Sequence, residues 1–308
     1  MFLLEESFHI NTMRCMKISS IMRLAAAAAA VLAASALPAE TIRLAGSDII
    51  AEKISEAVKK NAETLRLDVD ISMIGSRAAL EAMKGGSADI AIVAIPEGQP
   101  LPENHTLVPY AHQIAAILVN PQNPVEAISI PQLRRIFGNQ GERADSWSQL
   151  GFTNAASLRN IMPVSTGLKD NIAVELFKSK CLNNSNLSES VEIKADSAAA
   201  ARVVAEAGNA IAISTSAVPG TKPLAVSNPT AGVAAEAFKP TPENVQNGDY
   251  PLTMHFYLMY RPDSVKKIRP LLQMLLSDSM SDLIEKGGLM PAPKNFRKSY
   301  SLELDISK

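Results

Sequence analysis

Hydrophobic and polar residues follow two different periods in the first third of the chain. Residues 67–73 alternate strictly between apolar and polar side chains, which is typical of a strand with one buried face. Residues 50–65 instead repeat apolar side chains at helical spacing, with Lys and Glu on the other side. Residues 88–95 form a nearly continuous apolar run, as expected for a strand buried on both faces.

These segments alternate in a fixed order. A strand over 41–46 precedes the first helix, and a short helix through Ala79 and Met83, stopped by Gly85 and Gly86, follows the second strand. The order strand, helix, strand, helix, strand predicts a parallel sheet with right-handed crossovers, and the fold class is α/β.

The middle and end of the chain repeat this alternation. Ser129 and Pro131 open a helix as N-cap and early proline, and Asp196 caps an Ala-rich helix that ends at Gly208. Further strands are predicted over 114–119, 161–164, 210–213 and 253–260, and further helices through Ile172 to Phe177, through 271–276 and over 280–286.

The first 39 residues have the features of a signal peptide. Lys17 and Arg23 precede an apolar run over 24–36 that is too short and too Ala-rich for a membrane span, and Ala36 and Ala39 are small residues suited to cleavage. We expect an exported periplasmic protein that begins near Glu40 and does not span the membrane. Acidic and apolar residues before Met16 favour a translation start at Met13 or Met16.

Composition and charge exclude several classes of function. A formal net charge of -1 without a basic cluster argues against nucleic acid as a partner. Cys15 lies in the leader, so Cys181 is the one cysteine of the mature chain and no internal disulfide forms. His105, His112 and His255 show no metal-ligand spacing, and structural or surface roles are expected for them. No cofactor, metal or catalytic motif is expected, and the protein is not predicted to be an enzyme.

Two small turns carry the candidate chemistry. Gly46-Ser47 and Gly75-Ser76 each follow a predicted strand and open a helix, whose first backbone N–H groups are then available to an anion. A third strand ends in Ser165-Thr166-Gly167. The simpler alternative is that the serines are helix caps. The candidate ligand-binding residues are Ser47, Asp48, Ile49, Ser76, Arg77, Ser165, Thr166, Gly167 and Lys169.

A longer series of motifs points to a known family. The motifs, in order, are Ala45-Gly46-Ser47, Gly75-Ser76, Ser87-Ala88-Asp89-Ile90-Ala91, Leu118-Val119-Asn120-Pro121, Asn123-Pro124, the run from Ile130 to Gly138, Gly208-Asn209-Ala210-Ile211-Ala212, the run from Thr241 to Val245, and Gly248-Asp249-Tyr250-Pro251-Leu252. The run from Ile130 to Gly138 leads to Trp147 and Ser148, and Trp147 is expected to be a packing residue. In this order the chain resembles the phosphate-binding protein family of ABC importers, a branch of the type II periplasmic solute receptors.

The resemblance implies a fold of two α/β lobes, each a mainly parallel sheet flanked by helices, joined by two hinge strands that close around a ligand. Residues 40–113 and 260–308 would form lobe one and residues 114–259 lobe two, with Leu118 and Tyr257 near the crossings. It also implies a monomer that carries a small phosphate-like oxyanion to an ABC permease.

The chain departs from the family at two positions. Ala94 stands where the family has an aspartate that accepts the phosphate proton, and the arginine before the lobe-two motif is missing, although Arg77 and Lys169 are available to supply charge. Asp48 either repels an anion or caps a helix. Two hypotheses follow: a solute-binding protein for phosphate or a related oxyanion, or a protein of the same fold that has lost its ligand and serves as an envelope sensor or interaction module.

Overall fold

The computed structural model describes residues 40–95, 102–158, 160–167, 172–229 and 235–306. The expected signal peptide, its cleavage site and the alternative start residues lie outside these ranges. Residues 41–308 make up one compact unit. Within the described ranges, every helix is too short or too polar to cross a membrane.

A six-stranded sheet contains the first and the last strand of the described chain. Its strands are β1 (Ile42–Gly46), β2 (Val69–Ser72), β3 (Ile90–Ala94), β4 (Thr106–Ile114), β12 (Thr253–Tyr260) and β13 (Met290–Pro291), in the order β13-β4-β12-β3-β1-β2. β1 pairs in parallel with β2 and β3, which confirms the predicted alternation of strands and helices. The other pairs in this sheet are antiparallel.

Helices cover both faces of this sheet. They are α2 (Asp48–Thr64), α3 (Ser76–Lys84), α8 (Val265–Leu275), α9 (Asp278–Lys286) and α10 (Lys294–Ile306). Ile90 and Ile92 of β3 pack in one cluster with residues of α2, α8 and α9, whereas Ala91 and Val93 pack with Ala79 of α3. β3 is therefore buried on both faces, as its apolar run predicts.

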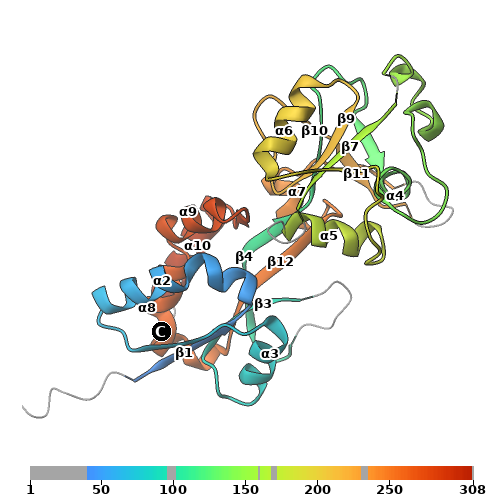
Figure 1. Cartoon of the computed structure of the whole chain (residues 1–308). Helices are drawn as coiled ribbons and strands as arrows, with labels where there is room; N and C mark the ends of the chain where they lie inside the picture. The colour runs from blue at the N-terminus through green and yellow to red at the C-terminus, as the bar shows by residue number, and fades with distance from the viewer. Residues whose placement is uncertain (1–39, 96–101, 159, 168–171, 230–234, 307–308) are drawn as a thin grey trace, which may run out of the picture. The chain divides into compact units, whose positions relative to one another are not determined.

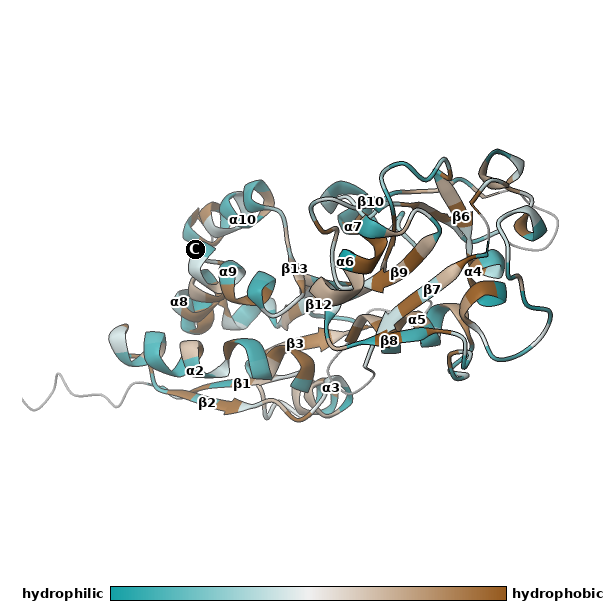
Figure 2. Cartoon of the chain, turned by 45° about the horizontal axis from the view of Figure 1, so that its top comes forward, coloured by the Kyte–Doolittle hydropathy of each residue, from teal (hydrophilic) through white to brown (hydrophobic). Residues whose placement is uncertain are grey.

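A five-stranded sheet forms the middle of the chain. Its strands are β5 (Ala116–Val119), β7 (Met162–Thr166), β8 (Glu192–Lys194), β9 (Ala210–Ser214) and β10 (Lys222–Pro223), in the order β10-β5-β9-β7-β8. β7 is parallel to β8 and β9, and β5 is antiparallel to its neighbours. Figure 2 shows how apolar the central strands β7 and β9 are.

The remaining elements accompany this second sheet. They are α4 (Ile130–Phe137), α5 (Ile172–Cys181), α6 (Ser197–Glu206), α7 (Pro242–Asn247), the paired strands β6 (Ala127–Ser129) and β11 (Ala225–Ser227), and short 3-10 turns at Ser148–Leu150, Thr153–Ala155 and Pro262–Ser264. Ser129 and Asp196 cap α4 and α6 as predicted. Trp147 is fully buried in the core of this half, which confirms its packing role.

The chain passes between the two sheets twice, at neighbouring residues. The Ala115 amide donates to the Leu252 carbonyl (3.0 Å), and the Tyr250 hydroxyl donates to the Ala115 carbonyl (2.8 Å). From there β4 and β12 run side by side, from Thr253 opposite Ile114 to Tyr260 opposite Thr106 (Figure 1). The fold is therefore α/β with two lobes joined by two strands. The predicted strand over 114–119 is divided between two elements, because Ile114 ends β4 and Ala116–Val119 form β5. The rest of β4 is a strand that the sequence pattern did not predict.

Asp89, directly before β3, links this strand to β1 and α8 through hydrogen bonds and ion pairs. Arg43 donates to it from its backbone amide (2.8 Å), Nε (3.0 Å) and Nη2 (3.0 Å), and Lys267 Nζ lies 3.2 Å away. Burial by itself raises the pKa of this carboxyl, but the hydrogen bonds from Arg43 and Lys267 outweigh it and hold the pKa far below its usual range. Asp89 therefore stays ionised while only 5% exposed.

We predict that Asp89→Asn lowers the free energy of unfolding by roughly 2–3 kcal/mol, because it leaves two cations facing a neutral amide. The loss stays below that of a fully buried pair since the Arg43 side chain is 39% exposed. Urea unfolding at neutral pH measures the change. Asp263→Asn is the control, because that exposed carboxylate makes a 3.8 Å ion pair with Arg261 and its removal is expected to cost little. Equal losses in both variants would contradict the prediction.

Candidate functional site

The Gly46-Ser47 turn joins β1 to α2 at the carboxyl end of the strand. Ser47 is the N-cap of α2, and its hydroxyl accepts from the Ile49 amide (3.3 Å) while the residue is 2% exposed. A Cβ added to Gly46 would lie 3.1 Å from both Cβ and O of Ile92, so the close approach of β1 to β3 favours glycine here. Asp48 is the exposed first residue of the helix, not its cap, which rules out the capping role considered for it.

The Gly75-Ser76 turn joins β2 to α3 at the same edge of the sheet. Gly75 has φ 121 and ψ 150, a conformation that favours glycine, and its amide donates to the Gly46 carbonyl (3.0 Å). Ser76 accepts through Oγ from the Ala94 amide at the end of β3 (2.9 Å). The ends of β1, β2 and β3 are thus tied together, and the structure brings Ser47 and Ser76 to one edge of the six-stranded sheet.

The neighbours of these serines have different surroundings. Arg77 is exposed at the second position of α3. Ile49 is half-buried and packs against the core between the sheet and α2, so its backbone amide and not its side chain faces the turn. Nothing in this arrangement buries the Arg77 guanidinium against the two serines.

Ser165 and Thr166 lie at the carboxyl end of β7 in the five-stranded sheet. Both are strand residues and not part of a turn as predicted, and both are almost fully buried. Among the described atoms, Ser165 Oγ has no hydrogen-bond partner. The Gly167 amide donates to the Lys194 carbonyl (3.2 Å), and a Cβ at Gly167 would meet nothing within 4 Å. Lys169 lies outside the described residues.

Ser214 is a buried hydroxyl at this edge that the sequence analysis missed. It ends β9, two residues after Ala212, which pairs with Val164 of β7. Its Oγ accepts from the Ser216 amide (3.4 Å). A serine that directly follows an apolar strand was the available signal, since the same pattern selected Ser165.

A pair of histidines lies where β4 and β12 leave the six-stranded sheet. His112 Nδ1 and His255 Nδ1 are 2.9 Å apart, and His112 Nε2 lies 2.9 Å from Gln246 Oε1 of α7. The rings meet edge to face, with centroids 4.9 Å apart. The sequence analysis assigned these histidines structural or surface roles because 143 positions separate them. Only the antiparallel register, His255 opposite His112, brings them together.

Burial controls the titration of His112. The residue is 1% exposed, and burial, reinforced by the neighbouring His255, lowers its pKa to about 4, although the hydrogen bond to Gln246 acts in the opposite direction. His112 is therefore neutral at the pH of most cellular compartments.

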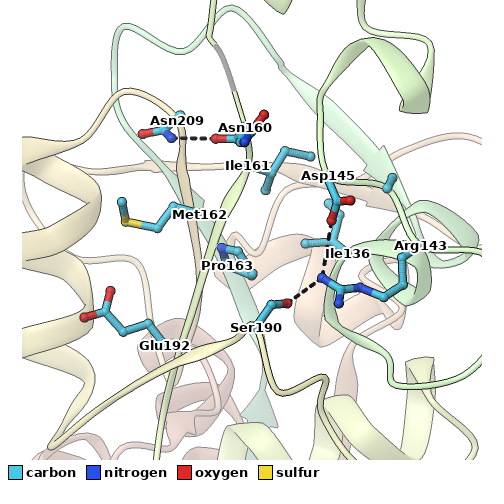
Figure 3. A pocket seen from close by; sticks show the side chains of 11 residues that line it. Ile136, Arg143, Asp145, Asn160, Ile161, Met162, Pro163, Ser190, Glu192 and Asn209 are labelled. Atoms are coloured by element: carbon cyan, nitrogen blue, oxygen red, sulfur yellow. Dashed lines mark hydrogen bonds and ion pairs between the residues drawn. The ribbon is translucent and has the colours of Figure 1, made fainter.

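One well-formed pocket lies away from these residues. It measures about 440 Å³ and is lined by residues at the amino ends of the parallel strands, such as Met162, Glu192 and Asn209 (Figure 3). Arg143 crosses its wall and donates to Ser190 Oγ (2.5 Å) and Asp145 Oδ1 (3.3 Å). The carboxylates of Asp145 and Glu192 disfavour an anion here, so this pocket does not match the predicted oxyanion site. In the described part of the chain, no three His, Cys, Asp or Glu residues lie close enough to hold a metal ion.

The lowered pKa of His112 predicts a pH-dependent stability. Between about pH 6.5 and about pH 4, the His112 ring is protonated in the unfolded chain and neutral in the folded protein. The free energy of unfolding therefore falls as the pH drops through this window. The slope from this one group is at most about 1.4 kcal/mol per pH unit. Urea unfolding of the wild type and of His112→Gln between pH 4 and pH 7 measures it, with His105→Gln as control. If the His112→Gln curve ran parallel to the wild type, the prediction would be wrong.

Comparisons with known proteins identify the family and the fold of the chain. The model of the PBP superfamily domain matches residues 32–280. The phosphate-binding protein PstS of Pseudomonas aeruginosa is 24% identical over 263 residues, which cover 78% of this chain and 79% of that protein.

Solved structures show the same fold. A possible phosphate binding protein from Planctomyces limnophilus superposes with a TM-score of 0.63 at 16% identity, covering 87% of this chain and 99% of that one. PstS from Borrelia burgdorferi gives 0.60 at 13% identity, with 82% and 98% covered. An ABC-type phosphate transport receptor from Vibrio cholerae gives 0.53 at 20% identity, with 81% and 99% covered. From the family match and the two-lobed fold, the chain belongs to the PBP superfamily.

Proposed function

We propose that this protein is an extracytoplasmic solute-binding protein that captures phosphate or a related small oxyanion and delivers it to an ABC permease. One observation carries the proposal. In each sheet, serines that are buried or half-buried lie at the carboxyl ends of neighbouring parallel strands, and in the six-stranded sheet they lie at the N-termini of helices whose N–H groups favour anions. The names of the relatives, phosphate-binding protein and phosphate transport receptor, support the same ligand class.

In the second lobe, the buried Ser165 hydroxyl supports this proposal. A hydroxyl that is buried without a partner has lost its hydrogen bonds to water, which costs free energy. An oxyanion oxygen at the end of β7 would accept a hydrogen bond from it. The open space beside Gly167 would let such a ligand approach the backbone.

The proposed site draws on both lobes. Ser47 and Ser76 contribute from lobe one and Ser165, Thr166 and Gly167 from lobe two, with Arg77 and Lys169 as candidate cations and Asp48 and Ile49 beside the first turn. We propose that the lobes close over the ligand by bending at the two crossings. The domain division at 113/114 and 259/260 stays a prediction. All of β12 belongs to the six-stranded sheet. This favours a second crossing near Leu252 over one at 259/260.

Transport also sets the cellular context that we propose. The protein acts as a monomer in the periplasm, without catalysis, and its partner is a membrane permease. Ala94 supplies no carboxylate to accept a proton from the ligand, so we expect weak discrimination between hydrogen phosphate and unprotonated anions such as sulfate.

Calorimetric titration with phosphate, sulfate and molybdate tests the proposal. The protein is expressed with its leader and purified from the periplasm, and we expect saturable binding of at least one anion. Ser76→Ala is expected to weaken that binding by roughly 10- to 100-fold, since a charge-assisted hydrogen bond contributes about 1.5–3 kcal/mol. Ser87→Ala is the control at the other end of α3, where the exposed hydroxyl donates to the Ala82 carbonyl (3.2 Å).

The outcome separates the two hypotheses for this fold. If none of the three anions binds to a folded protein, the oxyanion receptor is excluded. A ligand-lost sensor or interaction module is then the better description.

Ser165→Ala makes a second, sharper prediction. Without ligand, removal of the unpartnered hydroxyl should leave the free energy of unfolding unchanged or raise it by up to about 1 kcal/mol, while anion affinity falls. Ser188→Ala is the matched control, because that buried Oγ is hydrogen-bonded to Ser190 and its loss should cost about 1 kcal/mol of stability without changing affinity. A Ser165→Ala protein that is destabilised and binds normally would show a purely structural serine.

A further inference from the structure

Gln113 is a buried amide near the end of β4, next to the point where the chain leaves the six-stranded sheet. The residue is 3% exposed, and its Nε2 donates to the backbone carbonyl of Ile172 in α5. A carbonyl oxygen can only accept, so this contact fixes the orientation of the amide and leaves Oε1 as its other end. Within the ranges that the structure describes, Gln113 Oε1 has no hydrogen-bond partner.

An acceptor that is buried without a donor destabilises the folded protein. Gln113 Oε1 has lost its hydrogen bonds to water and has gained none in return. The great majority of buried polar side-chain atoms are paired, so this exception needs an explanation. A leucine of similar size would avoid the cost beside the apolar neighbours Ile114 and Met254. A ligand that donates a hydrogen bond to the amide would remove the cost in a different way.

Gln113 shares a face of the six-stranded sheet with the start of α2. Ala111 of the same strand packs in one core cluster with residues of α2 and α8, and every second residue of a strand points to the same face. Ala94 at the end of β3 and Ile49 in the first turn of α2 pack against that cluster too. Gln113 therefore lies on the side of the sheet where the helix behind the first serine turn begins.

The same amide contacts the second lobe. Ile172 belongs to α5, the helix that follows Ser165 at the end of β7, and its side chain packs against the core cluster of the first lobe. α5 also contacts β4 directly. Gln113 thus joins the elements that carry the two halves of the proposed site, which are the sheet with the serine turns and the helix behind Ser165.

Gln113 Oε1 and Ser165 Oγ differ in what they can bind. Both are buried, and neither has a hydrogen-bond partner among the atoms that the structure describes. The serine hydroxyl can donate to any oxyanion oxygen, whereas the amide oxygen can only accept. One ligand that satisfies both atoms therefore needs a bare oxygen and an O–H group. Hydrogen phosphate and hydrogen arsenate have both, whereas sulfate has only bare oxygens.

We propose that Gln113 is a specificity-determining residue of the oxyanion site: its Oε1 accepts a hydrogen bond from the O–H group of a protonated oxyanion. The inference rests on the proposed function. The proton stays on the anion, and no covalent bond forms or breaks. Because the amide is neutral, it does not repel a bare anion as a carboxylate would. The preference for a protonated anion is therefore small, about three- to tenfold, as expected from one hydrogen bond to a neutral group.

Calorimetry of the wild type with phosphate and with monofluorophosphate at pH 8 tests the proposal. Both anions are mainly dianions of nearly the same shape at this pH, but fluorine replaces the O–H group in the second. A difference in affinity therefore reports the hydrogen bond that the O–H group donates. We expect phosphate to bind about three- to tenfold more tightly than monofluorophosphate. Sulfate, a third dianion without an O–H group, should bind as weakly as monofluorophosphate.

Gln113→Leu assigns the preference to this residue. The variant removes Oε1, and we expect the ratio of the phosphate affinity to the monofluorophosphate affinity to fall to about one. Loss of the contact with Ile172 would change both affinities alike, so the ratio separates the two effects. Gln122→Leu is the control, because that glutamine is exposed in the turn after β5, and its ratio should equal that of the wild type.

The outcomes distinguish this inference from the proposed function. If the wild type binds phosphate and monofluorophosphate equally, or if Gln113→Leu keeps the preference, this inference is wrong and the proposed function stands. If the wild type binds none of the three anions, both are wrong.

A measurement on the wild type covers the case in which Gln113→Leu does not fold. NMR spectra of the Gln113 side-chain amide are recorded without ligand, with phosphate and with monofluorophosphate. We expect phosphate to shift these signals differently from monofluorophosphate, because only phosphate donates a hydrogen bond to Oε1. Identical signals with the two anions, in a protein that binds both, would overturn the proposal.

Discussion

Antiparallel pairing of β12 with β3 is the constraint on which the candidate site depends. It places a returning strand beside the end of the parallel strands, so residues far apart in the sequence, such as Ala94 and Phe256, meet at one sheet edge. The Gly75–Gly46 and Ser76–Ala94 hydrogen bonds then hold the ends of β1, β2 and β3 in register. The edge therefore combines hydroxyls, helix N-termini and a titratable pair without any local motif that contains all three.

Local patterns in the sequence were sufficient for the elements that bury apolar faces with a clear period. α2, β3 and α9 follow from spacing, and the caps at Ser129 and Asp196 follow from residue type. β4 did not follow, because Pro109, His112 and Gln113 interrupt its alternation and its partner is distant in sequence. The turns at Ser47 and Ser76 were identified, whereas the histidine pair needed a register that no single segment contains.

Several motifs that carried the family resemblance are structural in this molecule. Asn120 Nδ2 donates to the Val204 and Ala205 carbonyls (3.1 and 2.7 Å), and Asn123 Nδ2 donates to the Gly208 carbonyl (3.1 Å), so both satisfy the end of α6. Tyr250 binds the backbone at the crossing, and Asp89 binds Arg43. Such residues specify the fold and not the ligand. This explains why a chain can keep them in order while its ligand-contacting positions diverge.

The divergence has an electrostatic consequence. An arginine is charged at every physiological pH, so a site built on it binds anions independently of pH. Serine hydroxyls and helix N-termini supply only dipoles, and they offset the lost hydration of a dianion less completely than a full charge does. A site that keeps its serines without a fixed cation is therefore expected to bind a singly charged anion at a smaller cost in lost hydration than a dianion, with Ser76 and Ser165 setting the geometry.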